Sequence, residues 1–488
     1  MSDIATKKGA RETSIAKDGA ARDAVAKEGG RSVSTRAPGS IEVYREDFAL
    51  QTAGPAWLQA LRREGFARFD ALGFPTTKNE DWHFTSVAPI AERTFRLAAL
   101  ESQENAQDEN RRGSSRRKGD AANPLGVKEA DLDRFNFGEQ SWYTLVFLNG
   151  VFSEALSSYA GLDGAVRVSS LARAIAAGTP GIERNLGKIA KFEQHTFTAL
   201  NTAFISDGAF IELPADAVIE APVHLVFISG GEMVSHPRNL IVAGRHSRAT
   251  VVESYVSLSD SAYFTNAVTE IAIGEGARVD HYKLQRESEI AFHVGTLQVS
   301  EARDSQLHSF SFAVGGSLAR TNVYTSLDGN AATCTLNGLY LADGTQHIDN
   351  QTSIEHIAPN CPSHEIYKGV LDGRSHGVFN GKVYVHPEAQ KTDGKQSNNN
   401  LLLSPSARVD TKPQLEIFAD DVKCTHGATV GRLDEVAMFY LNSRGIGRET
   451  ARILLTYAFA ADVLETIELE PVKKALEEMV LARFVESE

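Results

Sequence analysis

GRHSRATVVESY, residues 244–255, is the first clear unit of a pattern that returns along the middle of the chain and decides the fold. The same order, a polar turn followed by a strand of alternating residues, returns in GEGARVDHYKL (274–284), EARDSQLHSFSF (301–312) and DGNAATCTLNGLY (328–340). Successive units begin 27 to 30 residues apart. A fixed period of this length, built from strands without an intervening helix, predicts a β-solenoid in which each coil covers the apolar face of its neighbour.

Short alternating strands of this kind extend from about Thr196 to Val430. A β-sandwich is the competing fold, because short strands at regular spacing suit it as well. The run QSNNN at 396–400 favours the solenoid, since Asn side chains stack in ladders between successive coils. A polar turn is the alternative interpretation of this run. We predict a mostly β protein with a solenoid core.

Helical patterns lie on both sides of this repeat. Residues 43–72 carry apolar side chains at spacings of three to five among Arg and Glu, and three further amphipathic segments follow the repeat at 433–444, 448–465 and 471–484. Gly445 and Gly447 separate the first two of these, and Pro471 suits the start of the third. We therefore expect an N-terminal helical and mixed domain at 41–195, the solenoid at 196–430 and a C-terminal helical domain at 431–488.

Two polar stretches contain few large apolar side chains. Residues 1–40 mix Ala, Gly and alternating charges, and residues 101–124 are rich in Asn, Ser, Glu and Arg. Such compositions do not offset the entropy of ordering, so we expect a disordered tail and a disordered insert. The tail lacks the apolar centre of a secretory signal, and its acidic residues argue against an organelle transit peptide.

The composition of the 488 residues excludes several classes of protein. Basic residues number 50 and acidic residues 63, and this net charge of −13 argues against nucleic acid as a partner. No run of about 18 apolar residues is present, so we expect no transmembrane helix. Three cysteines are too few for a disulfide scaffold and indicate a reducing compartment, which we take to be the cytoplasm.

Motifs for nucleotide and hydrolase chemistry are absent from the sequence. There is no GxxxxGK[ST] phosphate loop, no GxGxxG after a strand and no GxSxG nucleophile elbow. Paired acids for sugar hydrolysis remain an option, because four acids occur close together in the last part of the repeat: Asp393, Asp410, Asp420 and Asp421. Exposed turn carboxylates are the competing interpretation of these four.

Cys424 and His426 are the strongest candidates for metal chemistry. Residues two apart on a strand point to the same side, so the thiolate and the imidazole would lie next to each other while Thr425 faces away. Both groups bind iron or zinc, and two ligands do not complete a tetrahedral site. The rest must come from elsewhere in the fold or from another chain. The alternative is a buried cysteine with a histidine nearby.

The other two cysteines carry weaker signals. Cys361 lies in a loop with His356 and His364, where a metal site is an open possibility. Cys334 sits between two threonines on an alternating strand and is most simply a packed residue. No CxxC pair occurs, which excludes a self-sufficient cluster site of the ferredoxin type.

Four runs of the second half resemble the SufB and SufD family of iron-sulfur cluster assembly proteins: VHPEAQKTDGKQSNNNLLLS (385–404), VDTKPQLEI (409–417), DVKCTHGAT (421–429) and FYLNSRGI (439–446). The likeness extends over everything after about Asn201. Near the N-terminus, KNEDWHFT at 78–85 is similar to the signature of SufD rather than SufB. The tail and the insert are not part of the resemblance.

This resemblance implies a right-handed parallel β-helix flanked by helical domains. It implies a non-catalytic scaffold subunit that pairs with a SufB-like paralogue and docks the SufC-like ABC ATPase on about residues 433–488. The two β-helices would pair, which would place Cys424 and His426 near a cysteine of the partner. Iron or a transient iron-sulfur cluster would be held at that interface, and the partner would hydrolyse ATP.

Several alternatives stay open at this point. The chain could pair with a second copy of itself, and it could hold a cluster alone or only together with a partner. A β-helix carbohydrate-active enzyme would act on a polymer without an ATPase, whereas a purely structural interaction protein would not need Cys424 or His426.

Overall fold

The computed structural model describes residues 41–98, 123–138, 141–159 and 165–486. The tail expected at 1–40 and most of the insert expected at 101–124 lie outside these residues.

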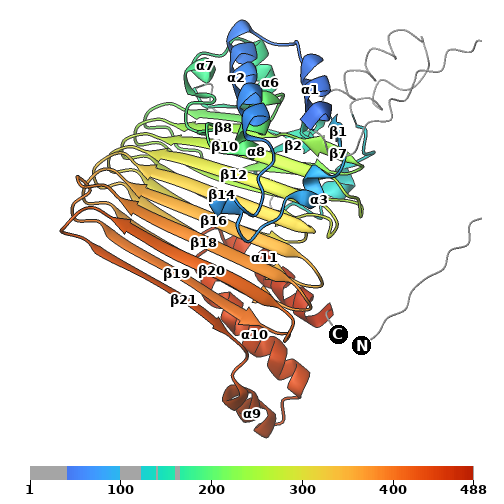
Figure 1. Cartoon of the computed structure of the whole chain (residues 1–488), viewed down its shortest axis with the longest axis vertical. Coiled ribbons are helices and arrows are strands. Elements are labelled where there is room, and N and C mark those ends of the chain that lie inside the picture. Colours follow the sequence, from blue (N-terminus) through green and yellow to red (C-terminus); the bar gives the residue numbers. More distant parts are fainter. Residues whose placement is uncertain (1–40, 99–122, 139–140, 160–164, 487–488) are drawn as a thin grey trace, which may run out of the picture. The chain divides into compact units, whose positions relative to one another are not determined.

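Two sheets form a parallel β-solenoid (Figure 1). We name them sheet A and sheet B. Sheet A contains β1 (Arg96–Leu97), β4 (Arg167–Ser170), β5 (Ala209–Leu213), β7 (Met233–Ser235), β8 (Arg238–Ala243), β10 (Phe264–Ile273), β12 (Phe292–Glu301), β14 (Leu318–Leu327), β16 (His347–His356), β18 (His376–Val385) and β20 (Arg408–Ile417). Sheet B contains β2 (Tyr143–Leu148), β3 (Val151–Ser158), β6 (Val223–Ser229), β9 (Arg248–Ser257), β11 (Arg278–Arg286), β13 (Gln306–Val314), β15 (Thr333–Ala342), β17 (Pro362–Leu371), β19 (Asp393–Leu402) and β21 (Lys423–Gly431).

The chain alternates between the two sheets from β8 to β21, so each coil contributes one strand to each sheet. Neighbouring coils pair in parallel and in unbroken register, as between β10 and β12. The polar turns stack as well: Gly274 N donates to Ala243 O at 2.8 Å. A Cβ on Gly274 would lie 2.8 Å from that same oxygen, so glycine permits the close approach of the turns. The predicted solenoid is confirmed.

Side chains that point inward from both sheets fill the space between them, which we call the lumen. Val279, Leu307 and Cys334 occupy successive positions of one inward ladder on sheet B and belong to the main apolar core. Alternate residues such as Tyr282 and Phe310 point outward and contact other elements. This alternation is what the period-two pattern predicted.

The N-terminal helices pack beside the first coils, at the upper end of Figure 1. They are α1 (Ile41–Ala49), α2 (Ala56–Leu72), the 3-10 turn η1 (Glu80–Trp82), α3 (Ala88–Ala91), α5 (Glu129–Leu132), α6 (Leu171–Ala176), α7 (Ile182–Asn185) and α8 (Thr196–Ala203). The helical pattern at 43–72 forms two helices rather than one. Gly54 has a φ of 108° and Pro55 precedes α2, which breaks the helix there.

Some details differ from the sequence pattern around Thr196. This residue begins α8, a buried helix, and not a strand. Strands β2, β3 and β4 precede it and extend the two sheets, with antiparallel pairs between β2 and β3 and between β4 and β5. The QSNNN run lies within β19 and is not a turn. Asn398 Nδ2 donates to Tyr367 O at 3.2 Å, and Asn400 Nδ2 donates to Asn398 Oδ1 at 2.6 Å.

The C-terminal helices are α9 (Glu435–Ser443), α10 (Arg448–Leu464) and α11 (Glu470–Glu486). Apolar residues of α10 and α11, among them Ala460 and Leu476, pack with Leu339 and Val370 of sheet B. Lys368 Nζ lies 2.5 Å from a carboxylate oxygen of Asp462. In the described part of the chain, no helix is long and apolar enough to cross a membrane.

Candidate metal-binding site

Cys424 and His426 both lie on β21, the last strand of sheet B. Within the described residues β21 pairs only with β19, so its other edge has no neighbouring strand. Strand β20 is the corresponding edge of sheet A. The solenoid therefore ends in an open coil, visible at the lower left of Figure 1.

The register places both side chains on the lumen side of this open coil. Four residues on successive strands form one inward ladder, which begins at the core residue Cys334, continues through Ser363 and Gly394, and ends at Cys424. His426 lies two residues further along β21, which separates the two Cα atoms by roughly 7 Å. The structure thus brings the predicted pair to one face of one strand, from which a thiolate and an imidazole can reach one ion.

The two side chains differ in exposure. Cys424 is half-buried beside Leu415 and Val422, and this burial raises the pKa of its thiol. His426 is exposed. A thiol with a raised pKa stays protonated at neutral pH until a bound cation displaces its proton.

The remaining cysteines lie away from this pair. Cys334 is fully buried in the core, and Cys361 is also buried, with its Sγ 3.4 Å from the main-chain oxygens of Gly329 and Pro359. The two histidines near Cys361 point to opposite sides of the coil. His356 Nε2 lies 2.9 Å from Ser363 Oγ in the lumen, whereas His364 lines a pocket on the outer face of sheet B.

The four acids considered for sugar hydrolysis do not form a pair of carboxylates. Asp410 lies 2.7 Å from His376 Nε2 on sheet A, Asp393 lies 3.4 Å from Lys395 Nζ on sheet B, and Asp421 pairs with Lys391 in a turn. Three of the four are thus bound to separate basic residues. Asp420 is an exposed turn residue.

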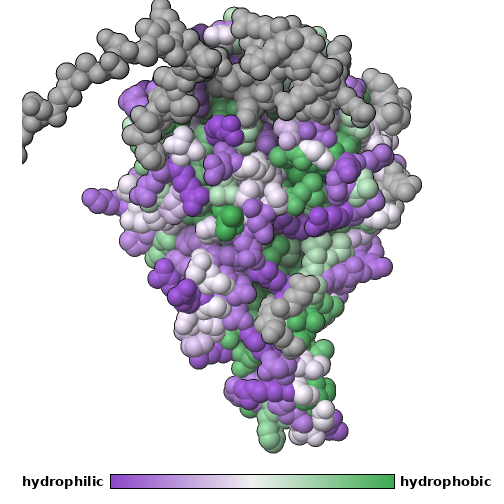
Figure 2. Space-filling model, turned by 90° about the vertical axis from the view of Figure 1, so that its right-hand side faces the viewer, coloured by the Kyte–Doolittle hydropathy of each residue, from purple (hydrophilic) through white to green (hydrophobic). Residues whose placement is uncertain are grey.

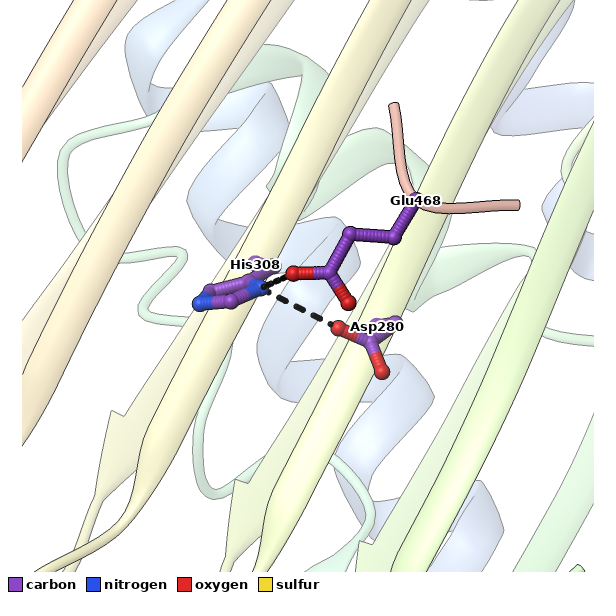
Figure 3. A group of neighbouring side chains, drawn as sticks. All are labelled: Asp280, His308 and Glu468. Carbon is purple, nitrogen blue, oxygen red and sulfur yellow. Dashed lines mark ion pairs between the residues drawn. The ribbon is translucent and has the colours of Figure 1, made fainter. Parts of the chain in front are cut away.

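A second group of metal-type ligands, which the sequence did not suggest, joins sheet B to the C-terminal helices. Asp280 on β11, His308 on β13 and Glu468 between α10 and α11 point toward one another on the outer face of the sheet (Figure 3). His308 Nδ1 lies 3.3 Å from a carboxylate oxygen of Asp280 and 3.5 Å from one of Glu468.

Arg278 already supplies the positive charge in this group. Its Nη2 donates to Asp280 at 2.9 Å, lies 3.2 Å from His308 Nδ1 and pairs with Glu468. Burial raises the pKa of Asp280, but hydrogen bonds from His308 and Arg278 outweigh it and hold that pKa below its ordinary value. Because one guanidinium nitrogen contacts all three ligands, we interpret the group as an ion-pair clamp.

Comparison with known families gives two matches. The family described as "SUF system FeS cluster assembly, SufBD core domain" matches residues 226–459, and "SufBD protein N-terminal region" matches residues 127–225. The first of these spans most of the solenoid and extends into α10.

Individual relatives agree with this family. An iron-sulfur cluster assembly SufBD family protein of Synechocystis is 31% identical over 87% of this chain and 91% of its own length. The iron-sulfur cluster assembly protein SufD of Bacillus subtilis is 28% identical over 89% of this chain and 95% of its own length. SufD of Escherichia coli is 40% identical over 54% of this chain and 61% of its own length. The chain therefore belongs to the SufBD family of iron-sulfur cluster assembly proteins.

Proposed function

We propose that this chain is a non-catalytic scaffold subunit of an iron-sulfur cluster assembly complex, and that it pairs with a SufB-like paralogue through the open end of its solenoid. One observation carries the proposal: Cys424 and His426 project from β21, an edge strand that has no neighbour on its outer side in the described part of the chain. These two residues supply part of a metal site, and a partner that binds to this edge could supply the other ligands.

The open coil has the properties of an interface. Strands β20 and β21 present unpaired main-chain groups over 10 and 9 residues, and long free edges of this kind are normally covered in proteins. Three large apolar side chains are exposed around the same coil: Ile417, Phe418 and Val430. A second β-solenoid that added its own strands here would satisfy the main-chain groups and cover these side chains.

Metal chemistry also favours a second chain. Cys424 and His426 supply one sulfur and one nitrogen ligand, whereas tetrahedral iron or zinc takes four ligands. A partner that meets β21 can supply the remainder. The iron or nascent cluster is then cargo, held between the subunits until it passes to an acceptor protein. Two copies of this chain could meet in the same way, which makes a homodimer the competing assembly.

The C-terminal helices suit a second partner, the SufC-like ABC ATPase. Helix α9 contacts α10 and exposes Val436, Phe439 and Tyr440, and Leu454 of α10 is exposed as well. Figure 2 shows hydrophobic residues beside hydrophilic ones on the lowest part of the molecule, where α9 lies in Figure 1. Because the sequence contains no phosphate-binding loop, ATP hydrolysis would come from this partner. Three free cysteines suit a cytoplasmic complex.

The test is co-expression with a SufB-like and a SufC-like partner, followed by anaerobic purification and measurement of iron and sulfide. We expect Cys424→Ser and His426→Ala to lower both contents and to impair growth in a complementation assay under iron limitation. Thr425→Ala is the matched control, since Thr425 faces the other side of β21. Normal iron content and growth in both site variants would remove the metal-site part of the proposal.

Pairing at the open end is tested separately. Phe418→Asp should prevent co-purification of the SufB-like partner, because the introduced charge would be buried in the interface. Leu50→Asp alters a side chain of similar exposure (60% against 56%) at the N-terminal end and should leave pairing unchanged. Light scattering on the chain alone distinguishes a homodimer. Retained pairing in Phe418→Asp would place the interface elsewhere.

A further inference from the structure

A short row of polar side chains, which we call the polar file, lies on the lumen face of sheet B and ends at His426 on the open coil. Glu365 on β17, Gln396 on β19 and His426 on β21 occupy the same inward ladder, in register with one another. In-register neighbours are separated by about 4.8 Å in a parallel sheet. The next residue of the ladder is Leu336, which is buried and apolar. The polar file is therefore confined to the last three strands before the open end.

Gln396 is fixed by its neighbours in the lumen. Its Nε2 donates to Glu365 Oε2 at 2.7 Å, and the two residues are only 4% and 2% exposed. The opposite strand leaves room for the amide at Gly381, where a Cβ would lie 2.4 Å from Gln396 Nε2. Because Glu365 Oε2 accepts this N–H, the oxygen end of the amide is the one that remains available.

The other end of this amide has no partner. Gln396 Oε1 is buried and, within the described residues, makes no hydrogen bond. A buried acceptor without a donor is unfavourable unless another function compensates for it. The neighbour on the open side of Gln396 is His426, whose imidazole has a nitrogen that can donate.

We propose that Gln396 is a positioning residue for His426: its Oε1 accepts a hydrogen bond from one ring N–H, and the other ring nitrogen then faces the metal. Histidine ligands commonly donate their second N–H to a fixed acceptor, which sets the tautomer and the ring orientation. Glu365 acts one step further back and holds the amide. This inference rests on the proposed function, in which Cys424 and His426 bind iron.

A merely structural role for Gln396 predicts a different response to mutation. If the amide only filled the lumen, Gln396→Met, a change of similar volume, would leave metal binding as in the wild type. As a positioning residue it should weaken metal binding by about 10- to 100-fold, the range found when second partners of ligands are removed. Glu365→Gln can still accept from Gln396 Nε2 and should remain close to the wild type, whereas Glu365→Leu should behave like Gln396→Met.

Cobalt(II) is a suitable probe, because a cobalt-bound thiolate gives a charge-transfer absorption that reports Cys424 directly. The full chain, alone and in the complex co-purified with its SufB-like partner, is titrated with Co²⁺. Gln414→Met, at an outward position of β20, is the matched control. Long-range ¹⁵N–¹H spectra of the Zn²⁺-loaded chain add the tautomer of His426, which should be single in the wild type and mixed in Gln396→Met.

The outcomes separate this inference from the function on which it rests. Wild-type cobalt affinity and a single His426 tautomer in Gln396→Met, with absorption lost in Cys424→Ser, would overturn the positioning role and leave the metal site intact. Absorption that is unchanged in Cys424→Ser and His426→Ala, or missing from the wild type in both preparations, would overturn the metal site itself. If Gln396→Met does not fold, the double variant Glu365→Leu/Gln396→Met, which removes both polar partners together, gives the same comparison.

Discussion

Arg320 Nη1 donates to the main-chain oxygen of Asp81 at 2.6 Å, and its guanidinium carbon lies 3.7 Å from the ring centre of Trp82. The KNEDWHFT segment at 78–85 is thereby attached to the outer face of sheet A. The same guanidinium pairs with Asp349 at 2.7 Å, and both charged side chains are almost fully buried. The segment that resembles the SufD signature is thus held in place by packing, with a buried ion pair beneath it.

Arg320→Leu should be strongly destabilising for this reason. The substitution leaves the Asp349 carboxylate buried without its cation, which costs about 3–5 kcal/mol in comparable sites. Guanidinium denaturation measures the loss. Lys412→Ala, which removes a pair with the exposed Glu80, is the control and should leave the midpoint nearly unchanged. A loss for Arg320→Leu no larger than in this control would mean that the hydrogen bonds from Thr85 Oγ1 and Gln351 Nε2, both 2.6 Å long, stabilise the Asp349 carboxylate without the guanidinium.

Glu301 should make the stability of the solenoid depend on pH. Its carboxyl accepts from Thr325 Oγ1 at 3.0 Å in the lumen, and burial raises its pKa to about 8. An unfolded chain releases this proton near the ordinary value of 4.5, whereas the folded chain keeps it up to about pH 8. The folded chain therefore loses stability as the pH rises between these values, on the order of 4 kcal/mol for this group.

Glu301→Gln has no proton to release, so its stability relative to the wild type should increase between about pH 5 and about pH 8. Urea midpoints across that range test this expectation. Glu388→Gln, at an exposed turn position, is the matched control. A wild-type minus variant difference that does not change with pH would show that Glu301 is ionised in the folded chain throughout.

The solenoid could be predicted because its determinants are local and repeated. Every coil carries the same alternation and a polar turn, so an error in one unit does not change the period. The C-terminal helices were predicted to within a few residues, since Gly445 and Gly447 interrupt an otherwise continuous pattern. The helical pattern at 43–72 did not locate the break between α1 and α2, which falls at residues 50–55.

The candidate site could be predicted only in part. Alternation alone places Cys424 and His426 on one side of β21. The register between strands about 30 residues apart decides which side of β21 faces the lumen. It also decides that Gln396 and Glu365 lie next to His426 on the same ladder. The turn lengths set that register. Arg278 and Glu468 are 190 residues apart in the sequence, and no local pattern connects them.

Helix α9 should be dispensable for folding and required for ATPase binding. Phe439 is 74% exposed, so Phe439→Asp removes an apolar contact surface without opening the core. We expect loss of the SufC-like partner in a pull-down with an unchanged melting temperature. Val485→Asp, at a 55% exposed site on α11, should retain binding. Deleting everything after residue 432 is a poorer test, because α10 and α11 cover apolar side chains of sheet B. Retained binding in Phe439→Asp would move the docking site off α9.

The ion-pair clamp of Arg278, Asp280, His308 and Glu468, unlike the site at Cys424 and His426, should bind no metal in the wild type. Since Arg278 Nη2 contacts Asp280, His308 and Glu468 together, the wild type should bind no Zn²⁺ at this group. Arg278→Ala removes the competing cation and leaves one imidazole and two carboxylates, a ligand set that zinc accepts. Zinc should then raise the melting temperature of Arg278→Ala in a concentration-dependent way, because a ligand that binds only the folded chain stabilises it.

Adding His308→Ala should abolish the effect. Cys424→Ser is placed in every background, so that zinc at the open end does not contribute. A zinc response in the Cys424→Ser chain that still carries Arg278, lost with His308→Ala, would show that the guanidinium does not exclude the metal and that this group is a second metal site.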